Sequence, residues 1–567
     1  MHAAAAAIRR AVPAETPTIV HCLQERGPSA HEINVCLSTE PRAVPANVAD
    51  ASVKLRIAAL ALALLVAALV RPPSLAAPQP EPVADVFPAI PEVRASGGVA
   101  RVVLHVVLDP VTGYPAFSWN AQLGVAPTIR VRPGETIDMT VYDDMRPFQG
   151  RPNNVNVHFH GLMVSPRAPG DDSLTTLARP GEVLHYRVAI PRDHEPGLYW
   201  YHPHAHGETY YDVTNGMAGA IVVEGLQQHL PALASMRERI IMLRDVPTGP
   251  SFVDPDMPVA MTMDGSTPAP RARSKGGEPC RAEPGLQPTL NGQADAHIGI
   301  RPGEPQFFRV VNGAAARYYD LSVDGVTLQL VALDGVPLDA YPGTPAVRRV
   351  THVLVAPGGR AEFVVTAPRT PTALRSGCVD TGRLGDANPA VMLAHLTNPA
   401  ADGSAPGPLP PSGPSPLRVG TALPRNLLSE PLPPPAARRT IRFTEDDRSL
   451  SINGHAFRMS DPPAIVARSG TVEEWTIENA TDEAHAFHIH QVHFVAESID
   501  GATVASRTWL DTIDVPPRHH TRSGHTIPGR VRVLIDFRNP LARGTFVYHC
   551  HILDHEDQGM MAKIRVL

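Results

Sequence analysis

The sequence predicts an all-β protein made of three tandem Greek-key β-sandwich domains. One observation is the content of turn-forming residues, because 61 prolines and 43 glycines among 567 residues favour short strands joined by turns over long helices. The other is an internal repeat, Ile-Arg-Val-Arg-Pro-Gly-Glu at 129–135, which recurs at 298–304 and in a weaker form at 465–470. The glycines of the three copies are 169 and 167 residues apart, which indicates tandem domains with one strand–turn–strand copy in each.

Residues 1–76 are predicted to be an upstream segment that ends in a signal peptide. An apolar run at 57–70 follows two basic residues and precedes small residues, which is the order of a Sec-type signal cleaved near Ala76-Ala77. The run is short for a membrane span, so the mature protein should be secreted or periplasmic. The alternative is an uncleaved anchor that holds the protein on a membrane. The long segment before the signal is explained most simply if translation begins near Val53.

The first predicted domain, residues 77–225, contains two His-x-His pairs, His158 with His160 and His202 with His204. The residues before the first pair alternate between apolar and polar, as in a half-buried strand. Alternate residues of a strand point to the same face, so each pair should present two imidazoles together. A single pair of this kind is as often a structural feature of a strand as a pair of metal ligands.

The second predicted domain, residues 226–400, contains no His-x-His pair and should act as a spacer or as a wall of a substrate site. After removal of the signal, three cysteines would remain in the chain: Cys280, Cys378 and Cys550. The first two could form a disulfide in an oxidising compartment or remain as two thiols. The Pro-rich stretch 401–437 that follows cannot build a core and should be a linker.

The third predicted domain, residues 438–567, carries the densest group of potential metal ligands. In one short segment, His549-Cys550-His551 is followed by His555 and Met560. A blue-copper centre takes two histidines, a cysteine and a weakly bound methionine. If His555 serves it and its second histidine comes from elsewhere in the chain, His549 and His551 remain for another site. On an extended backbone Cys550 faces away from its two neighbours. The segment can therefore hold a metal on each side and join the two sites by covalent bonds.

A third histidine group, His485, His488 and His490, precedes this segment. His488 and His490 form a further His-x-His pair, whereas His485 has the opposite parity and should face Cys550 together with His555. The four pairs supply eight imidazoles, enough for three coppers between the first and third domains. Zinc also binds cysteine and histidine, but a four-ligand zinc site would leave most of these histidines without a role.

This arrangement of four motifs resembles the multicopper oxidase family, of the three-domain, laccase-like bacterial kind, over roughly residues 97–567. The resemblance implies cupredoxin-like domains and about four coppers per chain, namely one type 1, one type 2 and two type 3. It implies a type 1 site of His485, Cys550 and His555 with Met560 as axial ligand, a type 2 site of His158 and His488, and a type 3 pair held by His160, His202, His204, His490, His549 and His551. His206 and His493 match no ligand position and are expected behind the ligands or at the surface.

The resemblance also implies the reaction. Single electrons enter at the type 1 site, pass from the Cys550 thiolate through its two histidine neighbours, and reduce O₂ to water at the other three coppers. Glu556 and Asp171 match positions whose carboxylates lie near the copper cluster in relatives, so both are candidate catalytic residues for proton supply. Asp172 is an equally placed substitute for Asp171. The alternative for each is a solvated surface carboxylate.

The reducing substrate is the least determined part of the prediction. Phenols and aromatic amines are the broad expectation for the family, and cuprous, ferrous or manganous ions in metal homeostasis are the alternative. The methionine group Met257, Met261 and Met263 is more typical of core packing than of a soft-metal site. A non-catalytic copper-binding cupredoxin protein is an alternative of another class, which the complete ligand set disfavours. A copper nitrite reductase would have no use for four His-x-His pairs.

The expected partners are O₂ and a small phenolic or metal-ion reductant. The formal net charge is -6 and no basic run occurs, which disfavours nucleic acid as a partner. We expect a monomer, in contact with a membrane only if the run at 57–70 stays as an anchor.

Overall fold

The computed structural model describes residues 87–110, 112–146, 153–247, 280, 286–397, 417–423, 426–445 and 449–567. All of these belong to one compact unit, residues 81–567. The predicted signal at 57–70 and the group Met257, Met261 and Met263 lie outside the described residues. Among the residues that are described, no helix is both long enough and apolar enough to cross a membrane.

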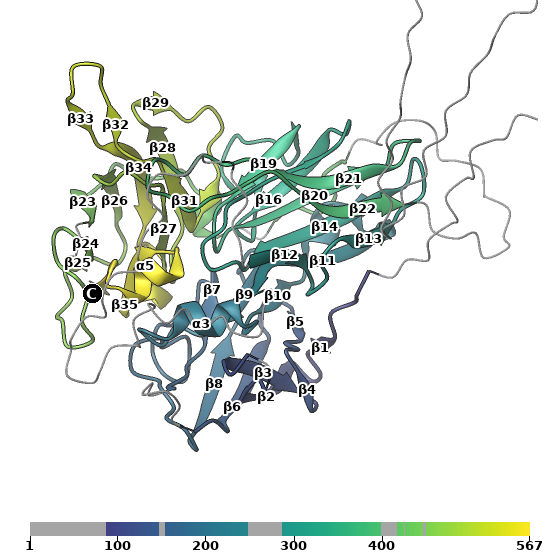
Figure 1. Cartoon of the computed structure of the whole chain (residues 1–567), viewed down its shortest axis with the longest axis horizontal. Helices are drawn as coiled ribbons and strands as arrows, with labels where there is room; N and C mark the ends of the chain where they lie inside the picture. Colours follow the sequence, from purple (N-terminus) through teal and green to yellow (C-terminus); the bar gives the residue numbers. More distant parts are fainter. Residues whose placement is uncertain are drawn as a thin grey trace, which may run out of the picture. The chain divides into compact units, whose positions relative to one another are not determined.

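The predicted fold class is confirmed, because the described residues form three tandem β-sandwiches with few and short helices (Figure 1). The first sandwich consists of two five-stranded sheets. In spatial order, one sheet is β1 (Glu92–Arg94), β5 (Thr128–Val131), β10 (Gly219–Val223), β9 (Gly197–His202) and β7 (His158–His160). The other is β4 (Gln122–Leu123), β3 (Pro115–Trp119), β2 (Val99–Leu108), β6 (Thr136–Asp143) and β8 (Val183–Ala189).

The second sandwich packs a seven-stranded sheet on a five-stranded one. The larger sheet runs β12 (Leu286–Leu290), β11 (Arg237–Pro247), β14 (Pro305–Asn312), β20 (Arg360–Thr366), β16 (Leu328–Leu333) and β17 (Val336–Pro337), with β18 (Arg348–Val350) also on β16. The smaller sheet runs β13 (Ala296–Gly299), β22 (Val391–Thr397), β21 (Thr372–Gly377), β15 (Tyr319–Val323) and β19 (His352–Val355).

The third sandwich repeats this plan. Its larger sheet runs β24 (Leu450–Ile452), β23 (Ala437–Glu445), β26 (Val472–Asn479), β34 (Gly529–Asp536), β28 (Phe494–Ile499) and β29 (Ala502–Thr503), with β30 (Trp509–Leu510) also on β28. Its smaller sheet runs β25 (Ile465–Ala467), β36 (Met561–Val566), β35 (Gly544–Cys550), β27 (His485–Ile489) and β31 (Thr512–Val515). A separate hairpin joins β32 (His519–His520) and β33 (Thr526–Ile527).

The internal repeat occupies the same structural position in each sandwich. Each copy begins in a short strand of one sheet (β5, β13 or β25), turns, and enters a long strand of the facing sheet (β6, β14 or β26). The turn contains Gly134, Gly303 or Gly470 at φ 89°, 77° and 86°, a backbone conformation that side chains with a Cβ rarely adopt. The repeat is therefore the crossing from one layer to the other. The exact domain boundaries near 225, 400 and 437 stay predictions.

Each sandwich buries its own apolar core between its sheets, and the cores include Leu104 and Phe159 in the first, Phe308 and Leu330 in the second, and Trp475 and Ile477 in the third. Phe159 lies between the two histidines of the first pair, and its burial in the core fixes the imidazoles on the opposite face of β7. Cys550 belongs to the core of the third sandwich, on the face opposite its two histidine neighbours.

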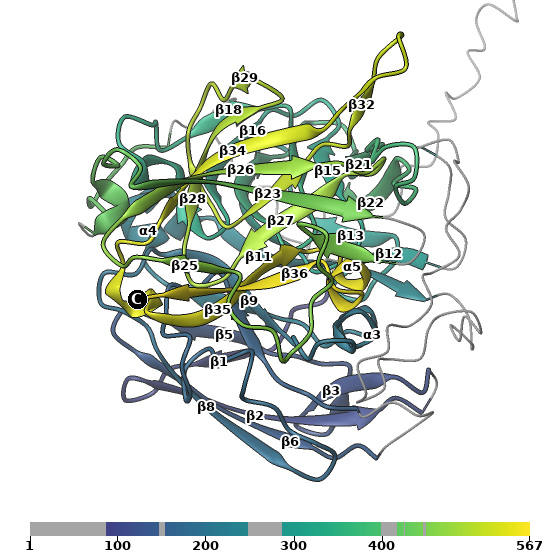
Figure 2. The ribbon, with the colours of Figure 1, turned by 90° about the vertical axis from the view of Figure 1, so that its left-hand side faces the viewer.

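The first and third sandwiches meet through two short helices, α3 (Thr209–Thr214) and α5 (Leu553–Asp557), which lie side by side (Figures 1 and 2). The carboxylate of Asp557 accepts hydrogen bonds of 2.8 Å from the backbone N–H groups of Gly207 and Tyr210. Because α3 follows the second histidine pair and α5 follows the Cys550 segment, this contact holds the two motifs against each other.

Part of the Pro-rich stretch is packed against the sandwiches. A 3₁₀ turn, η4 (Leu427–Ser429), buries Leu428 among side chains that include Met163 and Trp509. The indole N–H of Trp509 donates to the carbonyl of Leu428 over 3.0 Å. These residues of the stretch therefore contribute to a core that they could not form alone.

Candidate metal centre

The four His-x-His pairs converge where β7 and β9 of the first sandwich face β27 and β35 of the third. In the antiparallel ladder of β7 and β9, His158 is opposite His202, and in that of β27 and β35, His488 is opposite His549. Directly opposed residues share a face of a sheet, so both ladders present imidazoles toward the space between the domains. All eight are buried, with exposed fractions of 0–3%: His158, His160, His202, His204, His488, His490, His549 and His551.

These imidazoles form three groups in which the potential ligand atoms lie within 4.8 Å of one another: His160 with His202 and His551, His204 with His490 and His549, and His158 with His160 and His488. The closest approaches join nitrogen to nitrogen. His551 Nε2 lies 3.3 Å from His160 Nδ1, and His204 Nε2 and His490 Nε2 each lie 3.3 Å from His549 Nε2. Each group thus aims its ring nitrogens at one small volume.

The outer nitrogens of several rings are held by backbone carbonyls. The Nδ1 atoms of His202, His488 and His549 lie 2.7, 2.8 and 2.9 Å from the carbonyl oxygens of Pro203, Asp511 and Cys550. A carbonyl only accepts hydrogen bonds, so each Nδ1 carries the proton and each Nε2 keeps its lone pair. This fixes both the tautomer and the ring orientation that metal binding requires.

The chemistry of the donors fits a metal. Burial lowers the pKa of His158 and His202 well below the usual value, so both rings are neutral and able to bind a metal. The Nε2 atoms of His158, His202 and His488 are buried and have no hydrogen-bond partner among the described residues. A buried ring nitrogen without a hydrogen-bond partner is unfavourable unless it binds a ligand. The remaining rings with pKa values lowered by burial are His160, His204, His490, His549 and His551.

A separate group of potential ligands lies on the other face of the same strands. Cys550 Sγ is 3.5 Å from His485 Nδ1 and 3.8 Å from His555 Nδ1, and the two nitrogens are 3.2 Å apart. Met560 is fully buried in the same core as Cys550, and its backbone N–H donates to the carbonyl of His555 over 2.8 Å. Burial raises the pKa of the Cys550 thiol well above its usual value, and a bound cation would be needed to hold it as a thiolate.

The two aspartates after the first motif have different surroundings. Asp171 is buried, with its carboxylate 3.0 Å from His158 Nδ1, and it accepts hydrogen bonds from the Phe159 N–H and the Gln491 side chain over 2.9 and 2.5 Å. Asp172 instead accepts from the backbone N–H groups of the turn that follows it. Burial raises the pKa of Asp171 to about 7. Asp171 is therefore the one that contacts the imidazole groups.

Glu556 contacts two other imidazoles of these groups. Its Oε2 is 3.2 Å from His549 Nδ1 and its Oε1 is 3.5 Å from His204 Nδ1, while the Thr209 hydroxyl donates to Oε1 over 3.2 Å. Burial, with the nearby Asp557, raises the pKa of Glu556 well above its usual value. Neither Glu556 nor Asp171 is a solvated surface carboxylate.

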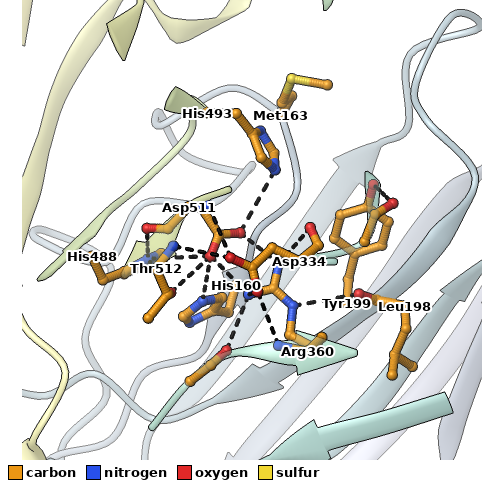
Figure 3. A network of polar contacts seen from close by, with 12 residues as sticks. His160, Met163, Leu198, Tyr199, Asp334, Arg360, His488, His493, Asp511 and Thr512 are labelled. Carbon is orange, nitrogen blue, oxygen red and sulfur yellow. Dashed lines mark hydrogen bonds and ion pairs between the residues drawn. The ribbon is translucent and has the colours of Figure 1, made fainter. Parts of the chain in front are cut away.

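The structure adds a buried ionic network that the sequence does not reveal (Figure 3). Asp511 has an oxygen 3.3 Å from His160 Nε2, and it receives two hydrogen bonds, of 2.8 and 2.5 Å, from the guanidinium of Arg360. Asp334 accepts from the backbone N–H of Asp511 over 3.1 Å. Burial would raise the pKa of Asp511, but the Arg360 charge holds it well below its usual value. An ionised carboxylate therefore lies directly behind the imidazole groups.

Arg360 and Asp334 come from the middle sandwich, so the prediction of that domain as a spacer or a wall is incomplete. The contact between Arg360 and Asp511 joins positions 151 residues apart in different domains, and neither belongs to a histidine motif. The middle sandwich also approaches the centre at Gly358, where a Cβ would lie 2.8 Å from ring atoms of His551. Only a residue without a side chain permits this close approach.

The two histidines without a predicted ligand role have different surroundings. His493 is 1% exposed and its Nε2 is 3.7 Å from Asp511 Oδ2, which puts it behind the ligands and excludes the surface position (Figure 3). His206 packs edge-on against the ring of Phe457, with centroids 5.0 Å apart, and burial lowers its pKa to about 4.

Comparisons with known proteins agree with this arrangement. Three family models described as multicopper oxidase match residues 112–228, 249–373 and 430–567. Over 509 residues the chain is 23% identical to the multicopper oxidase mco of Staphylococcus aureus, which covers 84% of this chain and 94% of that protein. Over 425 residues it is 27% identical to a laccase of Haloferax volcanii, covering 71% of this chain and 66% of that protein.

Two solved structures share the fold. One is a multicopper oxidase from Campylobacter jejuni described as a metallo-oxidase, with a TM-score of 0.64, 22% identity, and coverage of 86% of this chain and 96% of that one. The other is the laccase-like multicopper oxidase CueO from Ochrobactrum sp., described as active towards lignin model compounds and lignosulfonate, with a TM-score of 0.60, 21% identity, and coverage of 85% and 100%.

Proposed function

The chain belongs to the multicopper oxidase family, and we propose that it couples four one-electron oxidations of a reducing substrate to the reduction of O₂ to water. It is an oxidoreductase of a family that uses copper and O₂. The observation that carries the proposal is the position of Cys550. Its sulfur lies in one group of potential ligands, and the residues on either side of it, His549 and His551, lie in two others.

We propose four coppers per chain, held as the motif pattern implies. The type 1 ligands would be His485, Cys550 and His555 with Met560, and the type 2 ligands His158 and His488. The type 3 ligands would be the two groups formed by His160, His202 and His551 and by His204, His490 and His549. Bound copper would supply one-electron redox chemistry on the Cys550 side and the reduction of O₂ on the imidazole side.

The protein would conduct electrons between the two sites through the covalent bonds of its backbone. Cys550 is bonded through its backbone to His549 and His551, so an electron that reaches the thiolate passes to the imidazole groups without crossing solvent. The opposite parity of neighbouring strand residues keeps the two sites apart while linking them. This division suits a reaction in which donors deliver electrons singly and O₂ requires four.

The reductant would donate its electron at His555. As a whole residue His555 has an exposed fraction of 4%, whereas His485, Cys550 and Met560 are fully buried. Glu483 Oε1 lies 3.4 Å from His555 Nε2, so a carboxylate stands at the point of entry. A carboxylate there can accept the proton of a phenol or attract a cation. It therefore supports phenols and aromatic amines as substrates, with cuprous, ferrous or manganous ions as the alternative.

The protons for water formation would come through Asp171 and Glu556. Both are buried, they contact imidazoles of different groups, and each is hydrogen-bonded to a neighbouring polar side chain, Gln491 or Thr209. Their contacts with different imidazoles, His158 for Asp171 and His549 and His204 for Glu556, support two routes for protons rather than one. Asp511, held ionised by Arg360, would instead fix the orientation of His160 and His488.

A secreted or periplasmic location remains part of the proposal, with removal of the signal near Ala76-Ala77. The disulfide between Cys280 and Cys378 supports an oxidising compartment. We propose a monomer that associates with a membrane only if residues 57–70 are retained.

The experiment that tests the proposed function is copper reconstitution followed by measurement of O₂ uptake. The loaded protein should be blue, contain about four coppers per chain, and consume O₂ with at least one of a phenol, ferrous ion and cuprous ion assayed in parallel. Cys550→Ser is the matched control: it should be colourless and inactive with every reductant. One or two metals per chain, or mainly zinc in folded protein, would contradict the proposal.

A further inference from the structure

A second kind of potential metal site lies on the middle sandwich. Asp295, His297 and His395 each offer one ligand atom, and these three atoms lie within 4.8 Å of one another. Among the described residues, it is the only such group outside the metal centre. It contains no cysteine or methionine, and no part of the proposed oxidase reaction uses it.

The strand pairing creates this group. β13 and β22 run parallel, with His297 directly opposite His395. The residues on either side of both histidines are buried, whereas the histidines themselves are partly exposed. The alternation of a strand therefore turns both imidazoles to the outer face of the sheet, at its β13 edge.

Asp295 completes the group from the turn that precedes β13. Its φ of 50° lies in the left-handed region, which aspartate tolerates better than most residues. Its Oδ1 lies 3.0 Å from His395 Nε2. The two imidazoles are stacked, with centroids 4.8 Å apart and an interplanar angle of 17°.

One ring nitrogen of the group is unsatisfied. His297 Nδ1 is shielded from solvent and has no hydrogen-bond partner in the described part of the chain. The carboxylate of Asp295 contacts the other histidine, His395, over 3.0 Å. A ligand that accepts an electron pair from each ring and from the carboxylate could bind all three side chains, because their potential ligand atoms lie within 4.8 Å of one another.

We propose that Asp295, His297 and His395 form an exchangeable binding site for a divalent transition-metal ion such as Zn²⁺ or Cu²⁺. Two imidazoles and a carboxylate match the preferences of these ions and leave coordination positions open to water. The side chain of Asp295 is 63% exposed and that of His395 is 36% exposed, so the ion would exchange with solvent.

The test uses the copper-loaded protein, with Zn²⁺ as the probe. Equilibrium dialysis against Zn²⁺ and elemental analysis should give one zinc per chain in addition to the resident copper. His297→Gln and His395→Gln should each weaken this binding by at least about tenfold, since loss of a direct ligand exceeds the effect of losing an outer partner. Retention of the blue colour and of O₂ uptake would show that both variants are folded.

The control variant lies in the same sheet. His352 Nδ1 is 2.6 Å from Asp320 Oδ1 on β19 and β15, an exposed His–Asp pair that belongs to no metal-binding group among the described residues. His352→Gln should leave zinc uptake unchanged. Equal zinc uptake by wild type, His297→Gln and His395→Gln, or no zinc beyond the copper sites in wild type, would overturn the proposal.

Discussion

At the scale of single residues, two adjacent aspartates have the same charge but different surroundings. Asp171 shares hydrogen bonds with His158 and Gln491 and lies beside the proposed type 2 ligands. Asp172 receives hydrogen bonds from the N–H groups of Leu174 and Thr175 and closes a turn. From the sequence both aspartates are candidates for proton supply. The alternation of faces along a strand cannot distinguish them, because both lie beyond the end of the strand.

Asp171→Asn should slow turnover without removing the blue colour. The asparagine keeps the size of the side chain but cannot carry a proton between solvent and the imidazole groups, so we expect kcat to fall by roughly 10- to 100-fold. Steady-state O₂ uptake and the intensity of the blue band measure the two properties separately. Asp172→Asn is the matched control and should change kcat little. An Asp171→Asn variant with the kcat of wild type would contradict the proton role.

At the scale of elements, strand β20 of the middle sandwich supports the metal centre from outside. The side chain of Arg360 is fully buried and donates two hydrogen bonds to Asp511. Asp511 in turn contacts His160. Gly161 permits this arrangement, because a Cβ there would overlap the Arg360 guanidinium. One strand of the middle domain thus sets the charge behind ligands of the first and third domains.

Arg360→Leu should lower the unfolding free energy of the protein and weaken copper binding by the imidazole groups. Removing one partner of a buried ion pair leaves Asp511 as an uncompensated charge, which costs about 3–5 kcal/mol of unfolding free energy. We expect a lower denaturation midpoint and fewer than four coppers per chain, with the blue band retained. Arg375→Leu removes an exposed ion pair with Asp324 in the same domain and should cost at most about 1 kcal/mol. Equal effects of the two substitutions would refute the special role of Arg360.

His229, at the end of helix α4 (Leu226–His229), makes the stability of the protein depend on pH, and it belongs to none of the imidazole groups of the metal centre. His229 Nε2 lies 3.0 Å from both carboxylate oxygens of Asp339, and its Nδ1 lies 2.8 Å from the carbonyl of Thr421 in the linker. Burial alone would lower the pKa of His229, but these partners and the charge of Glu195 raise it above 6.5. The folded protein therefore binds this proton more tightly than the unfolded chain.

The stability that this proton contributes is present below pH 6.5 and disappears as the pH rises through the folded-state pKa. His229→Gln should consequently lower the unfolding free energy at pH 5.5, by on the order of 1 kcal/mol, and have less effect at pH 9. Chemical denaturation of both proteins at the two pH values measures the difference. A larger loss at pH 9 than at pH 5.5 would show that His229 is not the group responsible.

At the scale of the whole molecule, the sequence predicts the features that follow from local periodicity, namely the strand face on which each ligand lies and the repetition of the sandwich. The alternation of residues in β27 and β35 separates Cys550 and His485 from His488 and His549, and the strand register agrees with that separation. The internal repeat likewise predicts three similar sandwiches, because each copy encodes one crossing between sheets.

The sequence does not predict contacts that depend on how the domains pack. Arg360 and Asp334 lie in a domain without histidine motifs, and their approach to Asp511 results from the arrangement of three sandwiches. His493 is similar, since its spacing from His490 gives no sign that it would be buried against Asp511. Such contacts have no sequence period, and only the assembled fold reveals them.

The central claim is that two separate metal sites are joined through Cys550, and one measurement tests it most directly. Copper-loaded His488→Ala is reduced by substrate without air, and the blue band is then followed after O₂ is admitted. The proposed type 1 ligands remain, so the band should be present and should bleach, but loss of a proposed type 2 ligand should make its return in air slow or absent. Wild-type protein should recover its colour rapidly. Recovery of His488→Ala at the wild-type rate, or loss of its blue band while the other metals remain bound, would contradict the account.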